Sequence, residues 1–204
     1  MTRILLVDDH EVMRAGVRQV LSGGFPGAEF AEAGTAAEAL AKLEGGTWQL
    51  IVLDLAMPGR GGLDLLEETR RRWPRLPAIV LSAYAEEEFA IRCLQLGAAG
   101  YVAKSMAAHE LVAACHIAME GRKYVTPHLA ERLAGLMDGS APRAPHEALS
   151  PRELQVLQLV AAGRSLKQIA AELCLGEKTI STYRQRIAGK LGLSTNVELT
   201  PYAM

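Results

Sequence analysis

Five polar residues follow short apolar runs in the first half of the chain, and together they could carry out phosphoryl chemistry. They are Asp8, Asp9, Asp54, Ser82 and Lys104. Three carboxylates in one place repel one another unless a divalent cation joins them, and hard oxygen ligands suit Mg²⁺. A carboxylate could then attack phosphorus while metal and ammonium neutralise charge on the phosphoryl oxygens. These residue types therefore predict phosphoryl transfer to an aspartate.

Alternating strand and helix signals over the first 120 residues would bring these side chains together. The expected strands are 4–7, 30–33, 50–53, 78–81 and 101–102, and the expected helices are 11–21, 36–43, 63–72, 86–96 and 107–119. The helix at 36 should open with a capping box from Thr35 to Glu38. This order predicts the α/β class: a doubly wound, five-stranded parallel sheet with helices on both faces. Such a sheet binds its ligand beyond the carboxyl ends of the strands, where the five polar residues stand.

The rest of the chain is helical after a linker. Residues 122–148 are expected to form the linker, with a helix near 127–137 that starts at Thr126-Pro127. Capping boxes at Ser150 and Ser165 should begin two helices. A turn around Gly176 should follow the second helix, and a longer helix should span 177–191. A short last helix is expected after Thr195. A short helix, a tight turn with glycine and a longer helix are typical of a helix-turn-helix domain, here 149–204.

Composition limits the function classes. The 204 residues carry a net charge of −1. Residues from Ser150 onward hold seven Lys/Arg against four Asp/Glu, a net +3, so the remainder is −4. A basic C-terminal part is compatible with a nucleic-acid partner. Apolar runs are too short to cross a membrane, the N-terminus has no signal-peptide pattern, and three widely spaced cysteines fit a reducing compartment. We therefore expect a cytoplasmic protein without a membrane partner.

The segments 4–10, 52–59, 81–83 and 97–104 resemble the receiver domain of two-component response regulators, over about residues 1–121. The resemblance implies that Asp54 accepts a phosphoryl group from a sensor histidine kinase. It also implies a Mg²⁺ site formed by Asp9, Asp54 and the backbone carbonyl of Ala56, with Asp8 acting through water. The resemblance further implies that Ser82 and Lys104 contact the phosphoryl group. It also implies that Tyr101 is an aromatic side chain that turns inward, and that Tyr84 lies beside the path of the water that hydrolyses the phosphoaspartate.

The span 149–202 resembles the LuxR-type DNA-binding domain, and the whole architecture resembles the NarL/FixJ class. The resemblance implies that the helix at 177–191 enters the major groove of double-stranded DNA and that phosphorylation favours a homodimer. The expected DNA-binding residues are Lys178, Thr179, Ser181, Thr182, Arg184, Gln185 and Lys190. Ser181 stands where many relatives carry Lys, so the groove-facing set is less basic than usual. The final helix would be a dimer contact, and Pro201 within it is unusual.

Three other functions compete with this interpretation. An acyl-homoserine-lactone receptor with the same DNA-binding domain would need a ligand pocket in place of the acidic residues. An aspartyl-phosphate phosphohydrolase would need a second acid two residues after Asp54, where Ala56 stands. A regulator with vestigial phosphorylation would not need the complete set of acids, hydroxyl and lysine. We therefore expect a transcription regulator that is not an enzyme.

Overall fold

A computed structural model describes residues 1–57, 61–83, 86–106, 108–137, 149–173 and 175–193. Residues 138–148 of the predicted linker, the helix expected after Thr195, Pro201 and Tyr84 lie outside the described residues. The chain divides into two compact units, Met1–Ala134 and Gly135–Met204, and each is described by itself. No described helix is both long and apolar enough to span a membrane.

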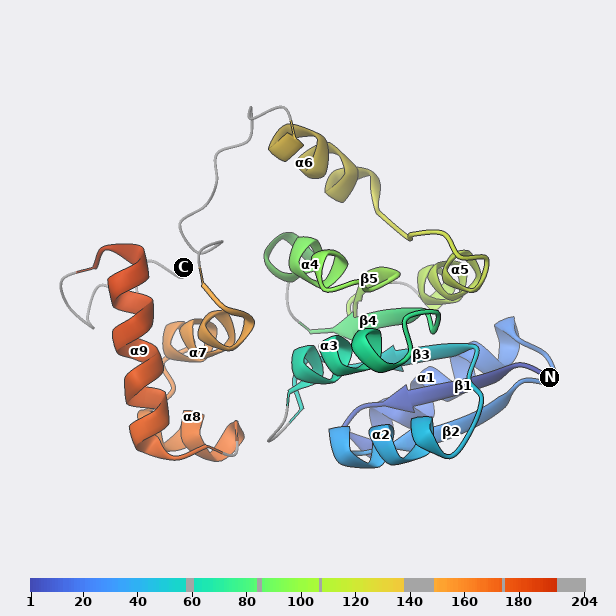
Figure 1. The fold of residues 1–204 in the computed structure, drawn as a ribbon, viewed down its shortest axis with the longest axis horizontal. Helices are drawn as coiled ribbons and strands as arrows, with labels where there is room; N and C mark the ends of the chain where they lie inside the picture. Colours follow the sequence, from blue (N-terminus) through green and yellow to red (C-terminus); the bar gives the residue numbers. More distant parts are fainter. Residues whose placement is uncertain (58–60, 84–85, 107, 138–148, 174, 194–204) are drawn as a thin grey trace. The chain divides into compact units, whose positions relative to one another are not determined.

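The first unit is built on the predicted parallel sheet (Figure 1). Its strands are β1 (Arg3–Val7), β2 (Glu29–Ala33), β3 (Leu50–Leu53), β4 (Ala78–Ser82) and β5 (Gly100–Ala103). They are ordered β2-β1-β3-β4-β5, and every neighbouring pair is parallel. The chain order reverses beside β1, so the carboxyl ends of β1 and β3 border the switch point where such sheets bind ligands.

Helices cover both faces of this sheet because the central strands are apolar on both sides. They are α1 (Glu11–Gly24), α2 (Ala36–Glu44), α3 (Gly62–Arg72), α4 (Glu86–Gln95) and α5 (Ala108–Met119). One hydrophobic core joins α1 and α5 to the sheet through residues such as Leu6, Val52 and Leu21. The predicted alternation of strands and helices is confirmed, with element ends shifted by up to three residues.

The capping box expected at α2 is only half formed. Thr35 accepts a hydrogen bond from the Glu38 amide as predicted. The Glu38 carboxylate instead accepts the amide of Gly34, one residue before the cap. The reciprocal bond of the capping box therefore falls one residue before the N-cap.

The first part of the predicted linker is held on the first unit. The Tyr124 amide donates to the Ala99 carbonyl over 2.8 Å, and Tyr124 forms an isolated parallel bridge with Gly100 at the edge of β5. A side chain at Gly100 would meet the Cβ of Tyr124 at 2.8 Å, so this close approach requires glycine. Helix α6 (Pro127–Met137) follows, with Leu129 buried.

The second unit contains the three helices of the predicted helix-turn-helix domain. They are α7 (Pro151–Ala161), α8 (Leu166–Glu172) and α9 (Glu177–Leu191). Ser150 and Ser165 both form complete capping boxes, with Glu153 and Gln168 respectively, as the sequence predicts. Helix α9 ends at Gly192, whose φ of 67° is readily adopted only by glycine.

Candidate functional site

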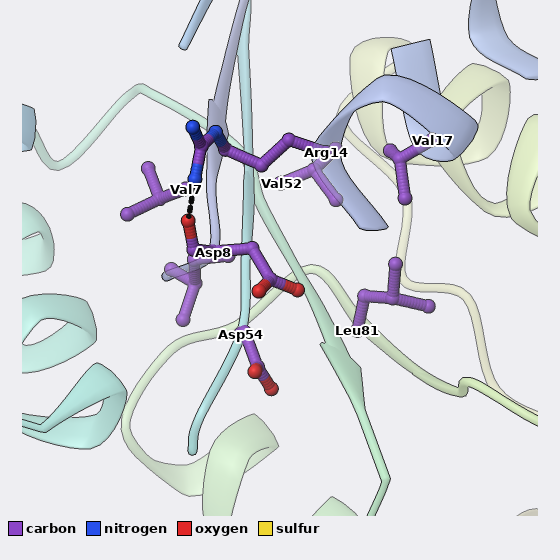
Figure 2. Close-up of a pocket in the computed structure, with 8 residues that line it drawn as sticks. Val7, Asp8, Arg14, Val17, Val52, Asp54 and Leu81 are labelled. Atoms are coloured by element: carbon purple, nitrogen blue, oxygen red, sulfur yellow. Dashed lines mark hydrogen bonds between the residues drawn. The ribbon is translucent and has the colours of Figure 1, made fainter. Parts of the chain in front are cut away.

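The carboxyl ends of β1 and β3 bring Asp8 and Asp54 together. The Asp54 amide donates to the Val7 carbonyl over 2.8 Å, and the Asp8 amide donates to the Ala33 carbonyl over 3.2 Å. Both residues are buried, at 5% and 2% exposure. Their carboxylates border a small pocket whose other walls include Arg14 and apolar strand residues (Figure 2). Two buried acids at one point of the sheet need compensating charge.

Lys104 supplies part of that charge. Its ammonium donates to Asp8 Oδ2 over 2.7 Å and to Asp54 Oδ2 over 2.9 Å. Burial alone would lower the pKa of Lys104, but the bonds to the two carboxylates outweigh burial and raise it. The Lys104 amide also donates to the Ser82 carbonyl over 2.7 Å, which extends the β4–β5 pairing and places the lysine at this edge.

Asp54 combines an ion pair with strong burial. Burial raises the pKa of its carboxyl above the ordinary value, while Lys104 and the Ala56 backbone amide oppose the shift. Its Oδ2 atom faces Lys104, whereas its buried Oδ1 atom has no hydrogen-bond partner among the described residues. A buried carboxylate oxygen without a donor is costly unless a cation or an electrophile uses it. Oδ1 is therefore the oxygen that can act on a ligand.

Four side chains fit a divalent cation. Asp8, Asp9, His10 and Asp54 each present a possible ligand atom, and these atoms lie within 4.8 Å of one another. Asp9 Oδ1 is also buried and makes no hydrogen bond among the described residues, although it lies 3.0 Å from His10 Nδ1. These two oxygens of Asp9 and Asp54, within a set of carboxylates, fit Mg²⁺ by donor chemistry. Sequence reasoning gave His10 no role, although its position next to Asp9 is the signal that could have found it.

A simpler role for the N-terminal acids, as caps of the next helix, does not match their geometry. The residue at the N-cap of α1 is His10, which makes no side-chain capping bond. Asp8 Oδ1 accepts the His10 amide over 2.8 Å, which orients the carboxylate just before the helix. Asp9 forms no cap either, so its carboxylate stays available at the site.

The remaining residues implied by the receiver resemblance lie near this edge. Ser82 is the last residue of β4 and is fully buried. Tyr101 lies on β5 and is 1% exposed. Ala56 is half-buried, two residues after Asp54. Their contacts with a phosphoryl group or a metal stay predictions.

Gly62 supports the same site and was missed by sequence reasoning. It begins α3, and its amide donates to the Leu55 carbonyl over 3.2 Å. A Cβ at this position would lie 1.9 Å from the Asp54 carbonyl oxygen. The loop after Asp54 therefore passes so close to α3 that any larger residue would displace it. The glycine pair Gly61-Gly62 was the available signal.

Helix α9 presents one polar face and one apolar face. The helical spacing of Ile180, Ile187 and Leu191 predicts an apolar face, and Ile180 and Ile187 are fully buried while Leu191 is half-buried. Six of the seven expected DNA-binding residues are exposed on the helix: Lys178, Thr179, Ser181, Thr182, Gln185 and Lys190. A continuous exposed polar face on the second helix of such a motif is the arrangement that docks in a major groove.

The basic residues expected on this face are arranged differently. Arg184 follows Ile180 by four residues and precedes Ile187 by three, so it lies on the apolar face, and its Nε atom is buried. The Lys190 ammonium donates to Glu153 Oε2 on α7 over 2.6 Å. The exposed arginine of the helix is instead Arg186, which sequence reasoning left out.

Comparison with known proteins agrees with both halves of the chain. Residues 4–116 match the profile of the response regulator receiver domain, and residues 147–203 match that of the bacterial regulatory proteins of the luxR family. The response regulator GacA of Pseudomonas protegens is 34% identical over 206 residues, covering 100% of this chain and 96% of the relative. The response regulator UvrY of Escherichia coli K12 is 32% identical over 205 residues, covering 100% and 94%.

A solved structure is similar along nearly the whole chain. RcsB from Salmonella enterica serovar Typhimurium, bound to promoter rprA in the presence of the phosphomimetic BeF3−, matches with a TM-score of 0.68 at 26% identity. The match covers 99% of this chain and 98% of that one.

Proposed function

Because the chain belongs to the two-component response regulators with a receiver domain and a LuxR-type DNA-binding domain, we propose that it accepts a phosphoryl group on Asp54 and then binds DNA as a homodimer to regulate transcription. The donor would be the phosphohistidine of a sensor histidine kinase, and the chain would act in the cytoplasm. The observation that carries the proposal is the buried Asp54 carboxylate, with one oxygen on Lys104 and the other making no hydrogen bond among the described residues.

The transfer step follows from this geometry. One oxygen of the Asp54 carboxylate attacks phosphorus, the P–N bond breaks, and its electron pair leaves with the imidazole nitrogen, which takes a proton from solvent. Lys104 is placed to turn its ammonium from the carboxylates to a phosphoryl oxygen, and the Ser82 hydroxyl would donate to another. Asp8, Asp9 and Asp54, with the Ala56 carbonyl, would hold Mg²⁺, which when bound supplies positive charge to the phosphoryl oxygens.

The competing functions are less well supported. Lys104 and the acids fill the edge of the sheet where a lactone receptor would need an apolar pocket. A phosphohydrolase would need an acid at Ala56 to protonate the leaving group, and an alanine cannot do so. Among the described residues, every group needed to form a phosphoaspartate is present at this edge.

DNA binding would use the exposed face of α9. Base contacts are assigned to Ser181, Thr182 and Gln185, and phosphate contacts to Lys178 and Arg186. RcsB, one of the structural relatives, was solved on a promoter in the presence of a phosphomimetic, which supports DNA binding by this chain. Arg184 and Lys190 are reassigned to roles inside the domain.

The proposed function is tested by DNA affinity before and after phosphorylation. The protein is treated with acetyl phosphate and Mg²⁺, and binding to DNA with two half-sites about one helical turn apart is measured by fluorescence anisotropy. Phosphorylation should raise the affinity about 5- to 150-fold, a usual range for coupled sites. Equal affinity for both forms, with phosphorylation verified by intact mass, would contradict the proposal.

Two arginines on α9 provide a matched test of the DNA-facing surface. Arg186→Ala should weaken DNA binding at all sequences and reduce the slope of log K against log salt by about 1, because one phosphate contact is lost. Arg184→Ala should leave that slope unchanged, because its side chain lies on the apolar face. Anisotropy titrations at four salt concentrations measure both. A reduced slope in Arg184→Ala alone would reverse the assignment.

A further inference from the structure

A half-buried arginine on α1 contacts the backbone between the two N-terminal acids of the site. Arg14 Nη1 donates to the carbonyl oxygen of Asp8 over 2.6 Å, and the bond is visible in Figure 2. The Arg14 side chain is 15% exposed and forms part of the wall of the pocket that Asp8 and Asp54 border. This arginine takes no part in the transfer step described above.

The bond fixes a particular peptide plane. The Asp8 carbonyl oxygen belongs to the peptide that joins Asp8 to Asp9, and the six atoms of that unit are coplanar. Holding the oxygen therefore sets the direction in which both Cα atoms present their carboxylates. Since β1 ends at Val7, strand pairing alone does not fix this plane. Without a donor, the buried carbonyl would also lack a hydrogen bond.

The arginine is itself held from a second strand. Its Nε atom donates to Glu32 Oε2 on β2 over 3.3 Å. Arg18, one turn later on α1, donates to the other oxygen of Glu32, also over 3.3 Å. A planar guanidinium with donors on two sides can bridge a carboxylate and a carbonyl in this way, whereas a lysine ammonium presents only one point of attachment. Glu32 therefore orients Arg14 toward Asp8.

We propose that Arg14 is a positioning residue for the divalent cation of the site: it sets the Asp8–Asp9 peptide so that both carboxylates face the position of the metal. The inference rests on the proposed function, which assigns these acids to Mg²⁺. Arg14 does not touch the cation or the phosphoryl group. Its effect passes through the backbone, as outer-shell partners of metal ligands commonly act.

The test measures Mg²⁺ affinity directly, without any phosphodonor. Backbone amide NMR shifts of residues 8–10 and 54–56 are followed during titration with MgCl₂, in the full chain. Arg14→Ala should weaken Mg²⁺ binding about 10-fold or more, the usual size of an outer-shell effect. Arg14→Lys keeps the positive charge but lacks the planar guanidinium with donors on two sides. Its affinity for Mg²⁺ should therefore fall by a smaller factor than that of Arg14→Ala. The matched control is Arg18→Ala, which removes a partner of Glu32 but has no bond to Asp8 among the described residues.

A second readout separates positioning from general damage. The rate of phosphorylation by acetyl phosphate is measured as a function of Mg²⁺ concentration. In Arg14→Ala the Mg²⁺ concentration that gives half the maximal rate should rise, and the rate at saturating Mg²⁺ should stay within about threefold of the parent rate. A Mg²⁺ affinity within twofold of the parent, or an equal loss in Arg18→Ala, would overturn the proposal. If Arg14→Ala does not fold, Arg14→Lys is measured instead, and a Mg²⁺ affinity within twofold of the parent would again overturn the proposal. A parent chain that binds Mg²⁺ but is never phosphorylated would refute the proposed function and leave this assignment intact.

Discussion

Replacement of Asp54 by Asn should abolish phosphorylation by acetyl phosphate, with the rate reduced by more than about a thousandfold. The amide is nearly the same size and can still accept from Lys104, but it is not a nucleophile, so the covalent step is lost rather than slowed. A thousandfold loss corresponds to about 4 kcal/mol of barrier, which is more than any other residue of the site is expected to contribute alone. Intact mass spectrometry of the protein after a fixed incubation gives the yield.

An exposed aspartate provides the control for this variant. Asp64 lies in the first turn of α3 and is exposed. Asp64→Asn should be phosphorylated like the parent, and in both proteins chelation of Mg²⁺ by EDTA should remove the reaction. An adduct of equal yield in Asp54→Asn would show that another side chain is the acceptor. Peptide mapping of that adduct would then identify the true site.

The position of the acidic residues could be predicted because a parallel sheet gives all its strands the same polarity. Once 4–7 and 50–53 are interpreted as buried strands, Asp8 and Asp54 must meet at one edge. The same reasoning places Ser82 and Lys104 there without any knowledge of loops. What the strand pattern could not supply is the orientation of each carboxylate, because that depends on bonds such as the one from Lys104, which is 50 residues from Asp54.

Arg184 is a residue for which helical angle and family resemblance point in different directions. The resemblance places it among the DNA-binding residues, and that assignment stays a prediction. At about 100° per residue, however, it lies about 40° from the buried Ile180 and about 60° from the buried Ile187. The same rule places Arg186 on the exposed face. Helical angle is therefore a better guide than charge to which residues of α9 face DNA.

Arg14 and Lys190 were beyond any local pattern. Arg14 acts on a backbone carbonyl, which every residue has, so no residue type marks its partner. Lys190 pairs with Glu153, 37 residues earlier, on another helix. Helical periodicity assigns a side chain to one face of its helix but does not identify the residue that it contacts on another element. The partners of Arg14 and Lys190 could therefore be identified only from the tertiary structure.

The bond between Lys190 and Glu153 joins the first and last described helices of the second unit. Glu153 is 3% exposed, and its Oε2 atom accepts both from Lys190 and from the Ser150 amide of the capping box. Burial would raise the pKa of Glu153, but Lys190 and Ser150 outweigh it and lower the pKa below its ordinary value. The carboxylate is therefore held ionised in the folded domain.

Glu153→Ala should destabilise the second unit by about 2–4 kcal/mol. The loss of the cap contributes about 1 kcal/mol and the loss of a charge-assisted bond about 1.5–3 kcal/mol. The half-exposed Lys190 can be hydrated, which limits the cost. Amide hydrogen exchange in α7 and α9 measures this unit alone. Glu172→Ala, at an exposed position of α8, should change the protection little. Unchanged exchange in Glu153→Ala would contradict the structural role of the pair.

The same bond predicts a pH dependence with a defined sign. Because the pKa of Glu153 is lower in the folded domain than its ordinary value of about 4.3, the stabilisation is fully present above about pH 5. It is lost as pH falls through the folded pKa, since the unfolded chain then binds the proton first. Amide exchange in α7 and α9 should therefore accelerate below pH 5 in the parent, after correction for the intrinsic rate. Glu153→Ala should lack this added acceleration, and an identical acid response in both proteins would show that another group destabilises the domain.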